Sequence, residues 1–195
     1  WFKDSVCGQE KDGDYFDVLN NAAKDVPAGS DGVLFLPYLT GGTNDVKEAT
    51  GCFLNMTLDT DQATLWHAVL EAIGYDYMEI TDLYRGAGVD MSRITITEGG
   101  SRSEIWNQMK SDMLGSEVIT LKNAGGAVVT DCIVGAYALG HITDMKAALT
   151  ESLEIKKLYY TNAENHDFYA KQYALQKKLV KQDMKEAFHT LKALH

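Results

Sequence analysis

The sequence of 195 residues has no apolar run that reaches the length of a membrane span, and it contains three cysteines. A transmembrane helix needs about 18 or more consecutive apolar residues, so no membrane-spanning segment is expected. Cys7, Cys52 and Cys132 lie far apart and form no C-x-x-C pair. This pattern suits a reducing cytosol better than a disulfide scaffold, and a cytoplasmic location is therefore expected.

The sequence also lacks an excess of basic residues. Its 18 lysines and arginines stand against 28 aspartates and glutamates, which gives a formal net charge of −10. Nucleic-acid binding draws its affinity from cationic contacts with phosphates, and an anionic membrane surface repels a negatively charged protein. Neither nucleic acid nor a membrane is an expected partner.

Several sequence motifs that are typical of particular enzyme classes do not occur in the sequence. There is no G-x-x-x-x-G-K-[ST] loop, no G-x-G-x-x-G that opens a helix after a strand, and no G-x-S-x-G elbow. These absences argue against a P-loop nucleotidase, a dinucleotide-binding fold and a serine hydrolase. The five histidines show no H-E-x-x-H or other ligand spacing, so no metal-ligating residue is predicted.

What the sequence does contain is an alternation of strands, glycine turns and helices. Residues 93–97 alternate in polarity as a strand does, a glycine turn follows at 98–104, and Gly115 ends the next helix. A second strand is predicted at 117–121 and a second helix at 128–139. This order indicates an α/β fold. The buried stripe of the first helix is predicted to be Ile105, Met109 and Met113.

Three further segments complete the expected single domain, residues 1–195. Residues 32–39 are apolar and fit a buried strand. A long amphipathic helix is expected to begin near Gln62 with Asp59 as its cap and to end at Gly86. A charged helix is expected from Asn165 to Leu194. The buried stripe predicted for the long helix is Trp66, Val69, Ile73, Tyr77 and Ile80.

The turn at Gly99, Gly100 and Ser101 is the strongest candidate site. A strand, two glycines and a helix start present backbone N–H groups with no side chains in the way, so a nucleotide can approach closely. Ser101 and Glu104 are spaced as a capping box for the following helix. Two glycines can equally make a tight β–α turn, and the residues alone leave both interpretations open.

Six segments, in order, resemble motifs of the FGGY carbohydrate kinases. Residues 34–41 are similar to F-x-P-Y-L-x-G, and residues 97–103 to G-G-G-[AS]-[RK]-S. Residues 1–4 look like W-[LF]-[RK]-D, and residues 49–58 like A-R-G-x-F-x-G-L-T. The other two segments are residues 68–73, similar to R-A-x-x-E-G-[IL]-A, and residues 160–169, similar to Y-x-P-[DN]-x-x-x-x-x-Y.

The resemblance implies most of the C-terminal lobe of a two-lobed kinase with an actin-like, ribonuclease-H-like α/β fold, incomplete at its N-terminal strands. ATP and Mg²⁺ are the implied cofactors. Gly99, Gly100 and Ser101 are expected to line the adenine and ribose site, with Ser103 and Glu104 at the start of the next helix.

The resemblance also implies that the phosphate-binding loop and the catalytic base precede Trp1. No catalytic residue is therefore expected within residues 1–195, and this stretch is expected to be inactive alone. D-xylulose, or a related keto-sugar or polyol, is the expected substrate. Without the upstream strands the sheet would have an unpaired edge, which favours a homo-oligomer.

Two departures from the motifs support a different interpretation. Asn55 stands where A-R-G-x-F-x-G-L-T has its second glycine. Residues 128–132 lie where the resembled family has an A-x-G-A-A helix, and Thr130 stands in place of its glycine. The alternative is a lobe that senses a nucleotide or a sugar and has lost kinase activity.

Overall fold

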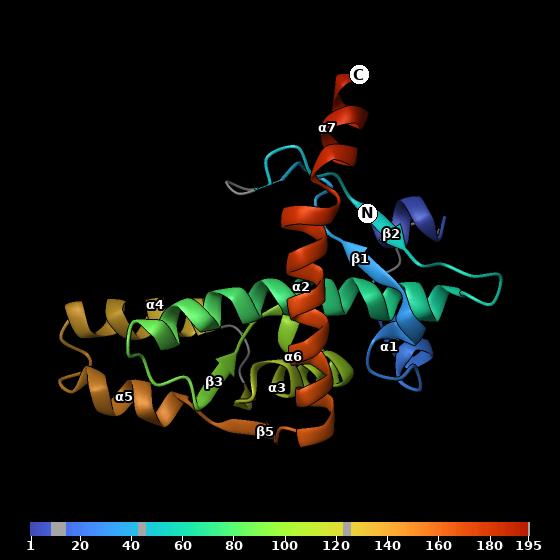
Figure 1. Ribbon diagram of the computed structural model, residues 1–195. Coiled ribbons are helices and arrows are strands. Elements are labelled where there is room, and N and C mark those ends of the chain that lie inside the picture. Colours follow the sequence, from blue (N-terminus) through green and yellow to red (C-terminus); the bar gives the residue numbers. More distant parts are fainter. Residues whose placement is uncertain (9–14, 43–45, 123–125, 195) are drawn as a thin grey trace.

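The computed structural model in Figure 1 describes residues 1–8, 15–42, 46–122 and 126–194. Its helices are α1 (Tyr15–Ala23), α2 (Gln62–Gly86), α3 (Glu104–Leu114), α4 (Gly126–Ala138), α5 (Met145–Ser152), α6 (Ala163–Lys178) and α7 (Lys185–Ala193). Its strands are β1 (Leu34–Leu36), β2 (Cys52–Leu54), β3 (Arg93–Ile96), β4 (Glu117–Leu121) and β5 (Ile155–Tyr159). Short turns of helix are the π-helical η1 (Phe2–Val6) and η4 (Leu179–Asp183) and the 3₁₀ η2 (Ser30–Gly32) and η3 (Gly99–Ser101).

The strands form two small sheets. β1 pairs with β2 in antiparallel fashion, and the order of the second sheet is β3-β4-β5. β3 and β4 run parallel, with α3 as the connection between them, whereas β5 runs antiparallel to β4. The predicted strand–turn–helix–strand unit is therefore confirmed. β3 is an edge strand within the described part of the chain, and self-association through that edge stays a prediction.

The long helix α2 is the centre of the core. It packs against α1, β1 and α3, and it lies across the middle of Figure 1. Gly74 permits the approach of α3, because a Cβ there would lie 2.2 Å from the sulfur of Met113. The apolar side chains buried around α2 include Leu19, Val33, Leu36, Trp66, Tyr75, Met109, Met113 and Tyr173.

The N-cap of α2 lies two residues after the predicted one. Asp61, rather than Asp59, is the N-cap, and its carboxylate accepts a hydrogen bond of 2.8 Å from the amide of Thr64. A cap must accept from an amide two or three positions ahead, and Asp59 lies too far back to do so. The predicted stripe on α2 is also too long, since Ile80 is 49% exposed.

The C-terminal helix is not continuous as predicted. The π-helical turn η4 separates α6 from α7, and the chain bends there in Figure 1. A π-helical turn offsets the residues that follow it relative to a 3.6-residue period. Tyr169, Tyr173 and Phe188 are buried, but Leu191 beyond the turn is 53% exposed.

Helices α4 and α5 pack against each other at the left of Figure 1, on the far side from β1 and β2. Although α4 is rich in apolar residues, none of its described side chains is buried, and Val128 is 68% exposed. No helix in the described part of the chain is both long enough and apolar enough to cross a membrane.

Candidate functional site

The glycine turn lies at the carboxyl end of β3 and leads directly into α3. Glu98 begins it with φ 59° and ψ −155°. These angles fall in a region that essentially only glycine occupies without strain, and they redirect the chain from the strand into η3. The redirected backbone places Gly99, Gly100 and Ser101 at the head of α3.

The carbonyl groups of the turn are held toward the protein. The hydroxyl of Ser101 donates to the carbonyl of Glu98 at 2.7 Å, and the amide side chain of Asn107 donates to the carbonyl of Ser101 at 2.7 Å. The amine of Lys110 donates to the carbonyl of Gly100 at 3.0 Å. The backbone amides of Gly99 and Gly100 donate to no backbone acceptor among the described residues.

The two glycines are not explained by the fold itself. A Cβ at Gly99 would meet no atom within 4 Å, and a Cβ at Gly100 would make only ordinary contacts, 3.4 Å from the ring of Trp106 and 3.6 Å from the amine of Lys110. Neither glycine has the positive φ that excludes other residues. A ligand that approaches the backbone from outside would account for both.

The other predicted site residues have separate roles. Ser103, not Ser101, caps α3, since its hydroxyl accepts from the amide of Trp106 at 3.3 Å. The predicted capping box between Ser101 and Glu104 is therefore wrong. The Glu104 carboxylate pairs with Lys157 on β5 at 2.9 Å. The structure thus brings together Gly99, Gly100 and Ser101, with Ser103 following them, while the side chain of Glu104 points toward the neighbouring strand.

Lys110 is a residue of the site that the sequence patterns did not single out. It is 1% exposed, and its amine lies 3.6 Å from the ring centroid of Trp106. Burial lowers the pKa of the Lys110 amine to about 8. A lysine between Met109 and Met113, on the buried face of α3, was the available signal, because a lysine is rarely buried without a partner.

Glu98 gives a first testable prediction. Glu98→Gly should raise the free energy of unfolding by about 1 kcal/mol, because relief of roughly 1–3 kcal/mol of backbone strain exceeds the entropic cost of a glycine. Denaturant unfolding measures this change. Glu98→Ala is the matched control, since it removes the carboxylate but keeps the strained backbone. Equal stability of the glycine and alanine variants would show that the conformation is not strained.

A second polar cluster is buried beneath η2. The Ser30 hydroxyl lies 2.9 Å from Nδ1 of His67 and donates to the Glu71 carboxylate at 2.7 Å. The amide of Gly29 also donates to Glu71, at 2.7 Å. The Nδ1 atom of His67 also lies 3.4 Å from the Glu71 carboxylate. Burial lowers the pKa of His67 to about 4 and raises that of Glu71 to about 7, so this contact is not an ion pair at neutral pH. Ser30 has no exposed surface, and the cluster anchors η2 to α2 rather than forming a nucleophile site.

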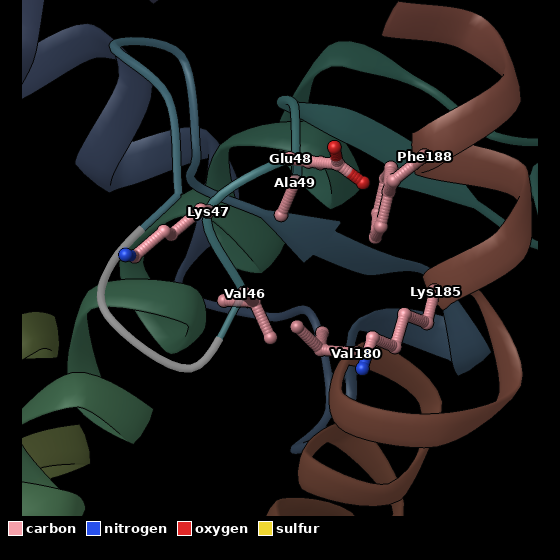
Figure 2. Close-up of a pocket in the computed structure, with 7 residues that line it drawn as sticks. All are labelled: Val46, Lys47, Glu48, Ala49, Val180, Lys185 and Phe188. Atoms are coloured by element: carbon pink, nitrogen blue, oxygen red, sulfur yellow. The ribbon is translucent and has the colours of Figure 1, made fainter.

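A cavity of about 260 Å³ opens between residues 46–49 and the C-terminal helices (Figure 2). Val46, Ala49, Val180 and Phe188 form its apolar wall. The charged residues at its rim are Lys47, Glu48 and Lys185. Among the residues that the structure describes, no cluster of three potential metal ligands occurs here or elsewhere.

Comparison with known proteins shows to which protein family the chain belongs. Residues 1–139 match the FGGY family of carbohydrate kinases, C-terminal domain, and the chain belongs to this family. Among its relatives, the xylulose kinase of Staphylococcus epidermidis is 28% identical over 93% of this chain and 36% of its own length. The gluconokinase of Bacillus subtilis is 32% identical over 75% of this chain and 30% of its own length.

Solved structures confirm the expected sugar-kinase lobe. The xylulose kinase from Rhodospirillum rubrum superimposes with a TM-score of 0.73 at 25% identity, over 92% of this chain and 35% of that protein. The glycerol kinase of Plasmodium falciparum, solved with ADP, shares the fold at 13% identity, with a TM-score of 0.73 over 92% of this chain and 35% of that protein. The chain therefore spans about a third of the length of these relatives.

The two departures from the resembled motifs are compatible with the fold. Asn55 has φ 61°, a left-handed conformation that asparagine tolerates better than most residues. Its side chain donates to the carbonyl of Gly32 at 3.0 Å. Thr130 is exposed on α4, so its side chain is not forced into the core of the described residues.

Proposed function

We propose that residues 1–195 are a single domain that supplies part of the nucleotide site of an ATP-dependent carbohydrate kinase. The observation that carries this proposal is the turn at Gly99 and Gly100. Its backbone amides donate to no backbone acceptor among the described residues, and its glycines are required neither by φ nor by packing. In a chain of the FGGY family, such a surface suits the adenine and ribose of ATP, with Ser101 and Ser103 ordering the turn.

The proposed reaction transfers the γ-phosphoryl group of ATP to a sugar hydroxyl. That chemistry needs charge neutralisation by Mg²⁺, a cradle for the phosphates and a carboxylate that accepts the hydroxyl proton. This chain contributes backbone donors at Gly99 and Gly100 and orders them through α3. The metal ligands and the base are proposed to belong to parts of the protein outside residues 1–195, so this stretch alone should not turn over.

D-xylulose, or a related keto-sugar or polyol, is the proposed acceptor. Xylulose kinases and gluconokinases occur among the relatives. ADP formation by the complete protein, measured with ATP, Mg²⁺ and a panel of D-xylulose, gluconate and glycerol, tests the assignment. We expect the highest kcat/KM with D-xylulose. A preference for gluconate would contradict the assignment of D-xylulose as the acceptor but would still support the proposed phosphoryl transfer.

The alternative is a lobe that binds a nucleotide or a sugar without transferring phosphate. Glu98 favours it, because a carboxylate stands beside the proposed site where the resembled motif has its first glycine. Nucleotide binding without ADP formation, for every sugar in the panel, would support the sensing role and contradict the kinase.

A further inference from the structure

Lys110 is a cation buried directly behind the glycine turn. It lies in the middle of α3, and among the described residues no carboxylate pairs with it. Its amine instead contacts the carbonyl of Gly100 at 3.0 Å, the side-chain oxygen of Asn107 at 3.4 Å and the face of the Trp106 ring. Burial of a charge with only neutral partners costs stability, so packing alone does not account for a lysine here.

The contacts of Lys110 converge on the geometry of the turn. Its hydrogen bond pulls the Gly100 carbonyl inward, and Asn107, which has no exposed surface, does the same for the Ser101 carbonyl. Because a peptide group is planar, the held Gly100 carbonyl fixes the amide of Ser101, which donates to the carbonyl of Glu98 at 3.1 Å. The held Ser101 carbonyl likewise fixes the amide of Arg102, which donates to the carbonyl of Gly99 at 3.2 Å. The carbonyls of Glu98 and Gly99 share their peptide groups with the amides of Gly99 and Gly100, so each of these N–H groups points away from the carbonyl that the turn holds.

We propose that Lys110 is a positioning residue for the nucleotide, because it locks the Gly100 carbonyl toward the protein and leaves the donor face of the turn to the adenosine part of the ligand. The inference rests on the proposed function. Lys110 acts through the backbone of the turn, and its amine, 1% exposed, does not itself reach the ligand. With a pKa of about 8, the amine is mostly protonated at pH 7, which strengthens its hydrogen bond to the carbonyl.

The test compares Lys110→Met with the unchanged complete protein. Methionine fills a similar volume and removes the buried charge, so the melting temperature should stay equal or rise. The Kd values for ATP with Mg²⁺ and for adenosine, measured by calorimetry, should both increase about tenfold. A residue that only supports the fold would lower stability and affinity together. Lys178→Met, which removes an exposed lysine paired with Asp183 at 2.7 Å, is the control and should keep the original affinities.

The outcomes separate the inference from the function on which it rests. If the unchanged protein binds no ATP, the proposed function is contradicted, and the inference is overturned with it. If it binds ATP and the folded Lys110→Met variant binds ATP equally well, the inference is overturned and the function stands. A loss confined to ATP, with adenosine unaffected, would indicate long-range attraction to phosphates and would contradict positioning of the turn. If neither Lys110→Met nor Lys110→Leu folds, Lys110 is a structural residue and the inference is also overturned.

Discussion

Replacement of Gly99 by tryptophan is expected to abolish nucleotide binding while the chain stays folded. A Cβ at this position meets no protein atom within 4 Å, and the backbone does not have a positive φ. The added indole would therefore occupy the space above the turn that we assign to the ligand. The Kd for ATP, measured by calorimetry with Mg²⁺, should increase by a factor on the order of 100 or more, which corresponds to about 2.7 kcal/mol.

Gly135→Trp is the matched control for this substitution. Gly135 lies on α4, where a Cβ also meets nothing within 4 Å and φ is again not positive. Both variants should melt close to the original temperature, and only the Gly99 variant should lose ATP. Equal affinity in the two variants would place the nucleotide somewhere other than this turn. Gly100 is the less suitable position, because a side chain there would touch Trp106 and Lys110.

Removal of the Glu71 carboxylate is expected to cause the largest loss of stability. Glu71→Ala would leave the amide of Gly29 and the hydroxyl of Ser30 buried without the acceptors they now have at 2.7 Å. Unsatisfied buried donors cost about 1–3 kcal/mol each, so the free energy of unfolding should fall by about 3 kcal/mol. For a domain of this size the melting temperature should fall by roughly 10 °C. A loss below about 1 kcal/mol would contradict the view that Glu71 anchors η2 to α2.

The Glu71→Gln variant tests the protonation of the same cluster. Burial raises the pKa of Glu71 to about 7 from 4.5, so the folded chain binds an extra proton between these values. That contribution to stability is fully present below pH 4.5 and is lost as the pH rises through 7. The stability of the original chain relative to Glu71→Gln should therefore decrease from pH 4.5 to pH 7 and then level off. A difference that is constant with pH would show that Glu71 is ionised throughout.

In the original chain and in Glu71→Gln alike, the titration of His67 makes the free energy of unfolding change with pH in the direction opposite to the effect of Glu71. Its pKa falls from 6.5 to about 4 on burial, so its contribution grows as the pH rises from 4 to 6.5. Because both chains contain His67, subtraction of the two pH profiles removes most of this effect and isolates Glu71.

The elements with strong periodicity were predictable from the sequence. Alternation at residues 93–97 gave β3, the Met109–Met113 spacing gave α3, and Gly115 with φ 58° ends that helix as expected. The sequence of β5 contains Lys156 and Lys157, whose charges conceal its strand character. Strand β2 has only three residues and is fixed by its partner β1, so its pairing is a tertiary effect.

The candidate site was predictable as a backbone feature but not as a set of side-chain contacts. Two glycines between a strand and a helix locate the turn at Gly99 and Gly100. The roles of Ser103 as cap, of Lys110 behind the turn and of Glu104 toward Lys157 depend on side-chain direction and on β5, which lies more than 50 residues away in the sequence. Spacing along the chain carries no information on contacts of that kind.

The most direct test of the nucleotide site is the shift of backbone amide resonances when ATP and Mg²⁺ are added to the isotopically labelled protein. We expect the amide resonances of Gly99 and Gly100 to move first and furthest, with those of Ser101 and Ser103 following, while the amide resonances of α4 and α7 stay in place. Saturable shifts confined to the cavity of Figure 2, or no shift in a protein shown to be folded, would contradict the assignment of the glycine turn as the adenosine site.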